Sequence, residues 1–288
     1  MSRPNSILNQ RKSFSYKIGR LAIRSLYQEL NLSYKPGLVS FLDSGSHKDM
    51  DARTFMRSIF SLRHYFKDMV FAGINEFSFK QMQKLGIEAE KRMFSFTKGI
   101  NTHKGAIFCM GILCAAIGNL HRKNMVISTS NISTFIIKTW KEDILYMSVP
   151  SKLTNGEKVK HKHACNGARE EAANGFLSLV CIGVPSLKST MNLCNNKEMA
   201  LIQTLFFLMR NLIDTNVLHR TGVKGLKLVH TVSNTFIQDN GIYQKDWLLK
   251  VQKIHSLFVS KNISPGGSAD LLAASWFLFS VEKECLCD

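Results

Sequence analysis

The sequence is poor in acidic residues. Its 288 residues include 21 Asp and Glu against 38 Lys and Arg, which gives a net charge of +17 and a pI near 9.7. This balance indicates an anionic partner or a basic surface. The basic residues are spread along the chain, and no zinc-finger spacing, basic region with heptads or RNP-like aromatic strand accompanies them. We therefore expect a polyanionic ligand but no nucleic acid.

Two further absences restrict the class of protein. The seven cysteines form no C-x-x-C pair, and their odd number cannot close fully into disulfides, which favours free thiols in a reducing, cytoplasmic setting. The longest uncharged apolar run, residues 105–118, is shorter than the roughly 20 residues that one membrane crossing requires. We expect no membrane span and interpret this run as a buried core helix.

What is present is the composition of a globular, helical protein. Apolar residues make up 45% and charged residues 20%, and a chain of this length buries a core without disulfides or a structural metal. At roughly 150 residues per domain, length alone suggests about two domains. Apolar side chains nevertheless recur at helical spacing on both sides of every loop candidate. We predict an all-α single domain over 1–288, with helices at residues 17–30, 52–67, 78–93, 105–120, 168–180, 197–213, 222–238, 247–260 and 268–281.

Three segments allow more than one interpretation. Residues 1–28 carry six basic and no acidic residues, which is the composition of a targeting segment, and residues 1–16 are a candidate disordered segment. The apolar stripe Ile18, Leu21, Leu26 and Leu30 favours the alternative of an amphipathic helix over 17–30. Residues 124–137 have a β-like composition with which a helix is also compatible. Residues 148–166 combine a Pro with several Lys and His and are predicted as a loop or flap.

The first polar cluster follows the first predicted helix. Lys35 opens the run Lys-Pro-Gly-Leu-Val, and Ser-Gly-Ser-His-Lys-Asp-Met-Asp follows at 44–51. If this second run is extended, His47, Asp49 and Asp51 point to one side at alternate positions. Carboxylates placed in this way suit Mg²⁺ bound together with substrate phosphates. The alternative, which the cluster by itself favours, is that the two Asp residues only cap the next helix and that the His is satisfied locally.

The second cluster combines a helix face with the loop after it. Glu90 and Thr97 share one helical face, and the helix then ends at Gly99. Four polar residues precede the apolar helix that opens at Gly105, and such a loop at a helix N-terminus is a candidate anion site. An ordinary polar loop between two helices is the competing interpretation. The four residues are Asn101, Thr102, His103 and Lys104.

The other three clusters lie at predicted helix ends. Arg169 precedes two Glu residues that complement a helix dipole, and its planar fork can grip phosphate at two points. The helix over 197–213 is followed by polar residues, and helix capping alone would not require two of them, His219 and Arg220. Ser-Pro-Gly-Gly-Ser-Ala-Asp at 264–270 is a Gly-rich turn with Ser268 as a natural N-cap, and its N–H groups could hold phosphate. The polar residues after 197–213 are Asp214, Thr215, Asn216, His219 and Arg220.

At these five clusters the sequence resembles the triphosphoribosyl-dephospho-coenzyme A synthase family. The matching blocks are KPGLV with SGSHKDMD, AE-x-x-M with T-x-G-I-NTHKGAIF, GAREEA with NGF, DTNVLHR-x-G, and SPGGSADLLA. They follow one another in the family order between Lys35 and Ala273. The chain departs from the family pattern at Ser40, Ser46, Glu170, Leu177 and Thr221, where Asp, Ala, Gly, Pro and Gly are usual.

The resemblance implies a transferase that joins ATP to 3'-dephospho-coenzyme A, forms 2'-(5''-triphosphoribosyl)-3'-dephospho-coenzyme A and releases adenine. The product would be the prosthetic-group precursor of citrate lyase or malonate decarboxylase and would pass to a carrier-protein transferase. Within this site we assign Glu90 or Asp214 as base or oxocarbenium stabiliser, and His103 or His219 as proton donor to adenine.

The remaining polar residues of the blocks are expected to bind the substrates. Mg²⁺ is expected to accompany ATP, with Asp49, Asp51, Asp214 and Asp270 as its ligands. Cationic side chains and the Gly-rich turn are expected on the phosphates. The expected substrate-binding and phosphate-binding residues are Lys35, His47, Thr97, Asn101, Thr102, Lys104, Arg169, Asn216, Arg220, Ser264, Gly266, Gly267 and Ser268.

Three other functions stay open on the residues alone. A hydrolase could cleave the N-glycosidic bond of a nucleotide with water as the acceptor. A nucleotide-binding protein without catalysis is supported only by the departures at Glu170 and Thr221. A nucleic-acid-binding protein would lose affinity steeply with salt. Adenine release that requires dephospho-coenzyme A separates the transferase from the hydrolase, whereas the oligomeric state and the choice between citrate and malonate do not follow from the sequence.

Overall fold

Helices are the only regular elements in the part of the chain that the computed structural model describes, residues 3–146 and 167–285. The predicted all-α fold is therefore confirmed. The loop or flap predicted at 148–166 lies outside the described residues. The helices are α1 (Arg3–Asn31), α2 (Ala52–Ser61), α3 (Tyr65–Ile74), α4 (Phe79–Phe96), α5 (Lys104–Arg122), α6 (Thr129–Leu145), α8 (Ala168–Ala173), η1 (Leu179–Gly183), α9 (Val184–Cys194), α10 (Lys197–Asn211), α11 (Thr215–Gln238), η2 (Gly241–Tyr243), α12 (Trp247–Ser260) and α13 (Gly266–Cys285).

The fold is built around α5. Nearly every residue of α5 between Ala106 and Leu120 is buried, as the apolar run predicts. Among the described helices, α5 is the one that is long and apolar enough to cross a membrane by length and composition, but its burial inside the bundle is typical of a core helix. Its neighbours therefore meet it with apolar faces of their own.

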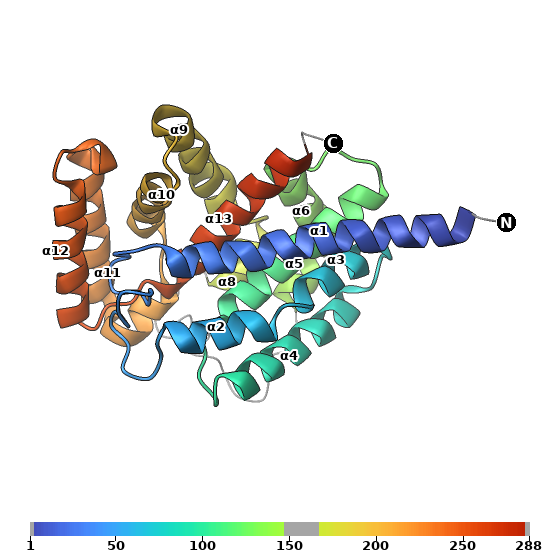
Figure 1. Ribbon diagram of the computed structural model, residues 1–288, viewed down its shortest axis with the longest axis horizontal. Coiled ribbons are helices and arrows are strands. Elements are labelled where there is room, and N and C mark those ends of the chain that lie inside the picture. The colour runs from blue at the N-terminus through green and yellow to red at the C-terminus, as the bar shows by residue number, and fades with distance from the viewer. Residues whose placement is uncertain (1–2, 147–166, 286–288) are drawn as a thin grey trace.

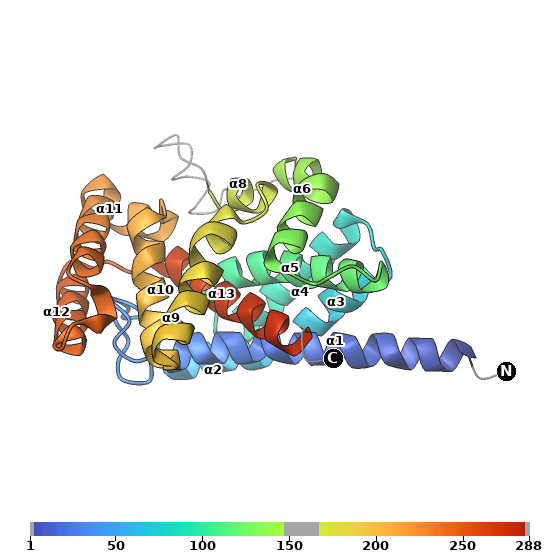
Figure 2. The same ribbon diagram turned by 90° about the horizontal axis from the view of Figure 1, so that it is seen from above.

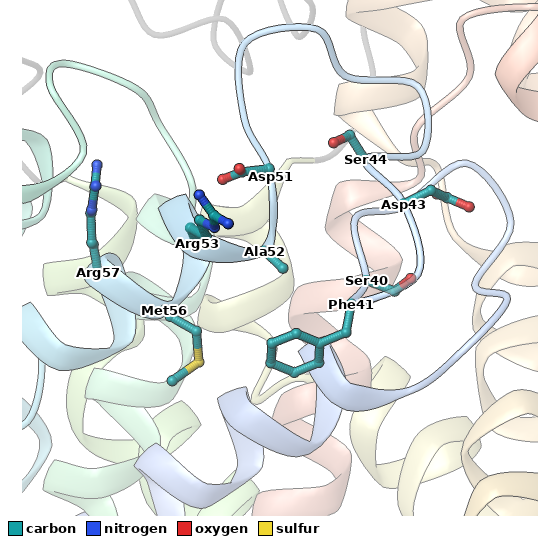
Figure 3. A pocket seen from close by; sticks show the side chains of 9 residues that line it. All are labelled: Ser40, Phe41, Asp43, Ser44, Asp51, Ala52, Arg53, Met56 and Arg57. Atoms are coloured by element: carbon teal, nitrogen blue, oxygen red, sulfur yellow. The ribbon is translucent and has the colours of Figure 1, made fainter.

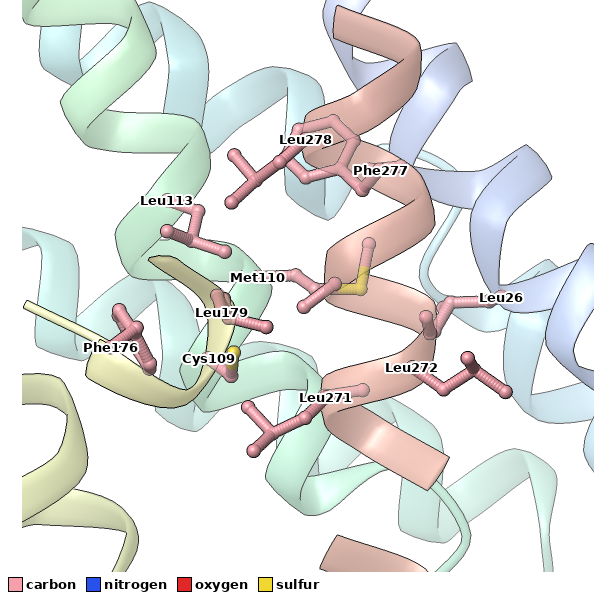
Figure 4. Close-up of a cluster of buried hydrophobic side chains, with 14 of the residues drawn as sticks. Leu26, Cys109, Met110, Leu113, Phe176, Leu179, Leu271, Leu272, Phe277 and Leu278 are labelled. Carbon is pink, nitrogen blue, oxygen red and sulfur yellow. The ribbon is translucent and has the colours of Figure 1, made fainter. Parts of the chain in front are cut away.

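Helices α1 and α13 cover one side of α5. α1 runs along the length of the bundle, and its predicted stripe, including Ile18 and Leu30, is buried (Figures 1 and 2). α13 lies between α1 and α5, so that Leu26, Met110 and Leu278 share one hydrophobic cluster (Figure 4). This cluster draws side chains from helices α1 to α13, and the fold is thus a single domain.

The structure extends the first helix towards the N-terminus and selects the helical alternative for most of residues 124–137. α1 begins at Arg3 and not near Lys17, so residues 3–16 are helical. The ring of Phe14 stacks on His121 of α5 with centroids 3.6 Å apart, which supplies the packing that composition alone does not reveal. The segment 124–137 leads into α6, because the Ser128 hydroxyl accepts the N–H of Asn131 and caps a helix.

Several other helices differ from their predicted bounds; α11, for example, begins at Thr215 and not at Gly222. The segment 52–67 divides into α2 and α3 at Leu62. The segment 168–180 breaks at Gly175 and Phe176, both at positive φ, before the π-helix η1. α13 begins at Gly266, so Ser268 lies in the first turn of this helix. The prediction that Ser268 is the N-cap is therefore wrong.

Helices α3 and α5 approach each other so closely that their backbones are in contact. A Cβ atom on Gly118 would lie 2.1 Å from the Val70 carbonyl oxygen, and one on Gly73 would lie 2.0 Å from the Ala115 carbonyl oxygen. Each glycine therefore faces the backbone of the opposite helix, where even a methyl group has no room. The position of α5 in the bundle depends on these two contacts.

We expect Gly118→Ala to destabilise the protein because the new methyl group must push α3 away from α5. Overpacking of this kind costs about 1–3 kcal/mol of unfolding free energy. Denaturant unfolding followed by circular dichroism measures the change. Gly86→Ala in α4 is the matched control, because its Cβ would meet only the Tyr65 hydroxyl, at 3.5 Å, and helix propensity should raise stability by up to about 1 kcal/mol. Equal effects of the two substitutions would contradict the close approach.

Candidate active site

A buried ion pair lies where the chain leaves α1. The Lys35 ammonium is 1% exposed and donates to the Glu29 carboxylate at 2.5 Å and to the Glu29 carbonyl at 2.6 Å. Burial lowers the pKa of Lys35, and the charge of Glu29 opposes this shift. Lys35 was predicted to bind phosphate. Its ammonium is instead engaged inside the protein, where it holds the start of the following loop.

The loop over residues 35–51 is fastened to the end of α12. The Ser46 hydroxyl donates to the Ile263 carbonyl at 2.6 Å. Gly37 has φ +69°, and a Cβ on it would lie 2.1 Å from the same carbonyl oxygen. The imidazole of His47 shares a hydrogen bond of 2.8 Å with the Ser264 hydroxyl. The first and fifth sequence blocks are thus joined directly, as their common membership of one site requires.

Arg220 of α11 completes this junction. Its guanidinium donates to the Ser46 carbonyl at 2.5 Å, to the Asn262 carbonyl at 3.1 Å and to the Asn262 side chain. Its third nitrogen lies 3.5 Å from the Nδ1 atom of His47. Burial, and then the charge of Arg220, lower the pKa of His47. Most donors of Arg220, predicted for phosphate, are thus used to hold the two loops together.

His255 of α12 anchors the same loop and was not predicted from the sequence. Its Nδ1 atom lies 3.0 Å from the Lys35 carbonyl oxygen, and its Nε2 atom lies 3.2 Å from the Asp43 carboxylate. Asp43 also accepts the N–H of Gly45 at 2.7 Å. A lone His between apolar residues of a predicted helix gives no signal of this role, which arises only from the tertiary packing of α12.

The carboxylate of Asp214 joins two helix N-termini. It is buried, accepts the N–H groups of Asn216 and Val217 at the start of α11, and accepts the N–H and hydroxyl of Ser268 in α13 at 2.9 and 3.1 Å. Burial raises its pKa, and these hydrogen bonds oppose the shift. The Gly-rich turn predicted to hold phosphate therefore directs the N–H of Ser268 at a carboxylate of the chain itself.

Asp270 caps the central helix in the same way. Its carboxylate accepts the N–H of Ala106 near the start of α5. A Cβ atom on Gly105 would lie 1.9 Å from its Oδ2 atom, so only glycine lets the carboxylate approach. Burial, followed by the charges of Glu29 and Asp214, raises the pKa of Asp270 well above its usual range. The first, second, fourth and fifth blocks therefore meet around the N-terminus of α5.

His103, at the N-cap of α5, is a buried and uncharged imidazole. Its Nδ1 atom is 2.7 Å from the Ser58 hydroxyl, and burial followed by the charge of Lys35 lowers its pKa to about 3. Its Nε2 atom and the Thr102 hydroxyl are buried without a hydrogen-bond partner among the described residues. A proton donor must first carry the proton, so this low pKa argues against the predicted role of His103 as proton donor to adenine. His103 can still act as a hydrogen-bonding group.

Glu90 and Lys104 lie at the edge of this buried centre. Their side chains are 26% and 34% exposed and form an ion pair of 3.0 Å, so both are within reach of a ligand from solvent. Asn101 accepts the N–H of Lys104 at 3.2 Å and caps the helix start. Thr97, predicted as a ligand, donates its hydroxyl to the carbonyls of Met93 and Ile100, which is a structural role.

The predicted metal ligands do not form one site. Asp51 is exposed and caps α2 by accepting the N–H and hydroxyl of Thr54, both at 2.8 Å, and these bonds lower its pKa. Asp49 is 64% exposed beside His47, whereas Asp214 and Asp270 cap helices in the interior. In residues 3–146 and 167–285, no three His, Cys, Asp or Glu side chains are grouped closely enough to hold a metal ion.

The remaining predicted residues lie on helix surfaces. Asn216 and His219 are exposed on α11, and Gly266 stands beside the Asn216 amide. Arg169 is partly buried on the short helix α8. The fifth-block turn is closed by a bond from the N–H of Gly266 to the Ser264 carbonyl at 2.9 Å.

A hollow of about 610 Å³ opens between the loop over residues 40–44 and α2 (Figure 3). Its rim carries the carboxylates of Asp43 and Asp51, and α2 contributes Arg53 and Arg57. Neither arginine belongs to a sequence block, although their spacing of four residues on an expected helix is a signal that a search for paired cations could have found.

We expect Glu29→Gln to destabilise the protein by about 3–5 kcal/mol near neutral pH, because the Lys35 ammonium then stays buried without a carboxylate. The folded-state pKa of Lys35 is already below its unfolded value, and the substitution lowers it further. Loss of the proton relieves the penalty, so the deficit of the variant should shrink as the pH rises towards about 10. Denaturant unfolding across this pH range measures it.

The double variant Glu29→Gln with Lys35→Met serves as the control for this pair. Removing the ammonium together with the carboxylate leaves no uncompensated charge, so we expect most of the lost stability to return at neutral pH. A double variant as unstable as Glu29→Gln would show that the carboxylate acts in another way.

Comparison with known proteins finds a matching family model and related sequences. A family model described as ATP:dephospho-CoA triphosphoribosyl transferase matches residues 15–286. A protein of Acinetobacter calcoaceticus named probable 2-(5''-triphosphoribosyl)-3'-dephosphocoenzyme-A synthase is 38% identical over 268 residues, which cover 93% of this chain and 92% of that protein. The 2-(5''-triphosphoribosyl)-3'-dephosphocoenzyme-A synthase of Pectobacterium atrosepticum is 34% identical, with 93% and 90% covered.

No solved structure matches the chain. The family match nevertheless spans the helices from α1 to α13 and includes all five blocks. Four of these five blocks meet around the N-terminus of α5. The chain belongs to the ATP:dephospho-CoA triphosphoribosyl transferase family.

Proposed function

We propose that the protein transfers the triphosphoribosyl group of ATP to 3'-dephospho-coenzyme A. The bond between the ribose C1' atom and adenine breaks, and a bond from C1' to the 2'-hydroxyl oxygen of dephospho-coenzyme A forms. The hydroxyl loses its proton, and adenine leaves with one. The observation that carries the proposal is the convergence of four family blocks around the N-terminus of α5.

The charges around this centre suit both substrates. Triphosphate and dephospho-coenzyme A are polyanions, and the chain carries a net charge of +17. Lys104 stands at the edge of the site with a partly exposed ammonium. Cations there can bind phosphate oxygens, whereas the interior offers neutral or capped groups for the sugar and the base. The Nε2 atom of His103 and the Thr102 hydroxyl are suitable hydrogen-bond partners for such a neutral part.

Glu90 is the carboxylate that we assign to the reacting atoms. Departure of adenine builds positive charge on the ribose, which a nearby carboxylate stabilises, and the attacking hydroxyl needs a base. Both oxygens of Asp214 already accept hydrogen bonds from the chain, which makes it the weaker candidate for these roles. Glu90 has only the ammonium of Lys104 to release when a substrate binds. His219, exposed on α11, remains the proposed proton donor to adenine.

We further propose that Mg²⁺ enters with ATP. Mg²⁺ is commonly held by one or two carboxylates together with substrate phosphates and water, so a preformed cage is not required. Asp49 and Asp51, on the exposed loop before α2, are carboxylates of this kind. The product, an unattached prosthetic-group precursor, would pass to a carrier-protein transferase that serves citrate lyase or malonate decarboxylase. The free thiols of Cys109 and Cys114 suit a reducing, cytoplasmic setting.

Incubation of the protein with ATP, Mg²⁺ and dephospho-coenzyme A tests the reaction. We expect free adenine together with an adduct whose mass equals dephospho-coenzyme A plus the triphosphoribosyl group, measured by liquid chromatography and mass spectrometry. Omitting dephospho-coenzyme A is the control and should abolish adenine release. Adenine without the adduct would support a hydrolase, and no adenine would leave a nucleotide-binding protein.

Glu90→Gln tests the assigned carboxylate. We expect kcat to fall by about 10²- to 10⁴-fold, because a positioned base contributes that much, while thermal unfolding stays close to that of the unaltered protein. Glu88→Gln is the matched control: Glu88 lies on the same helix, is exposed and pairs with Lys91 at 2.8 Å. Near-normal turnover of Glu90→Gln with intact folding would contradict the assignment.

A further inference from the structure

The hollow beside α2 contains cations that the helix caps and ion pairs described above do not use. It is bounded by Ser40, Phe41 and Ser44 on the loop and by Arg53 and Arg57 on the helix. Figure 3 shows both guanidinium groups rising from α2 on the same side as the carboxylate of Asp51. The space between loop and helix is therefore lined by two arginines, by Asp43 and Asp51, by hydroxyl groups and by the apolar side chains of Phe41, Ala52 and Met56.

Of the two arginines, Arg53 interacts electrostatically with the Asp51 carboxylate without forming an ion pair. Both are exposed, and in the described parts of the chain no carboxylate lies within ion-pair distance of either guanidinium. Residues four apart on a helix have Cβ atoms about 5–6 Å from each other, so the two groups can contact neighbouring phosphoryl groups of one chain. The Asp51 carboxylate beside them can bind a divalent cation that the phosphates carry.

The loop that forms the opposite wall is held in place before any ligand binds. The N–H of Ser40 donates to the Asp43 carbonyl at 2.9 Å, and the Asp43 carboxylate contacts His255. The ring of Phe41 is 50% exposed at the hollow and stands 6.1 Å from the ring of Tyr27. A wall fixed in this way binds a ligand without the entropic cost of ordering a loop.

We infer that this hollow is a polyphosphate subsite in which Arg53 and Arg57 bind phosphoryl groups of a nucleotide substrate. The inference rests on the proposed function for its substrates. The triphosphate of ATP and the pyrophosphate of dephospho-coenzyme A share this chemistry. The hollow lies beside the loop that carries the first sequence block, and His47 of this block is hydrogen-bonded to Ser264 of the fifth.

Binding of inorganic tripolyphosphate with Mg²⁺, measured by isothermal titration calorimetry, tests the site without any turnover. We expect Arg53→Gln with Arg57→Gln to weaken binding by about tenfold or more, because two charge-assisted contacts to phosphate are lost. Arg20→Gln with Arg24→Gln is the matched control, because these arginines are exposed and also one helical turn apart, on α1. Equal weakening by both pairs, or none by the first, would overturn the inference.

Steady-state kinetics then assigns the ligand. A rise of the KM for ATP alone places the triphosphate in the hollow, and a rise of the KM for dephospho-coenzyme A alone places the pyrophosphate there. Unchanged KM values for both substrates in the Arg53 and Arg57 double variant would overturn the inference. The single variant Arg57→Gln, at an exposed position without a described partner, guards against a folding defect. If the unaltered protein has no transferase activity but the double variant loses tripolyphosphate binding, the proposed reaction is refuted and the subsite is not.

Discussion

Buried carboxylates that cap helix N-termini are the interaction on which the arrangement of this site depends. Asp214 accepts N–H groups from α11 and α13, and Asp270 accepts one from α5. Each helix start has N–H groups without intrahelical partners and a partial positive charge, so one carboxylate can hold two such ends together. Three helices that are distant in sequence are thereby drawn to one point, with their positive ends directed inward.

This arrangement divides the polar residues of the motifs into two groups. Lys35, Asp214 and Arg220 bind other parts of the chain and give the site its shape. Glu90 and Lys104, at the edge, remain accessible to a substrate. A two-substrate transfer between large polyanions needs both groups, because the reacting atoms must be aligned while the phosphates stay in contact with exposed cations.

The sequence predicted the helical class, most helix positions and the block residues that meet. These features depend on apolar periodicity and on motifs, which involve only residues within one segment. The prediction failed where the outcome depends on another segment. The start of α13 at Gly266 follows from Asp214, and the inward role of His255 follows from the loop that packs against α12. The spacing of Arg53 and Arg57 marks a cation pair on one helix face, but the hollow beside them forms only when the loop over residues 40–44 stands opposite them.

Three of the five departures from the family pattern, at Ser46, Glu170 and Thr221, follow the same division. The Ser46 hydroxyl donates to the Ile263 carbonyl, the Glu170 carboxylate accepts the N–H of Gly167 at 2.8 Å, and the Thr221 hydroxyl donates to the Val217 carbonyl at 2.9 Å. Each new polar group thus binds backbone within its own region of the framework. A chain that had lost catalysis would be free to change its accessible charges first, yet Glu90 and Lys104 are retained. The departures therefore give no support to a binding protein without catalysis.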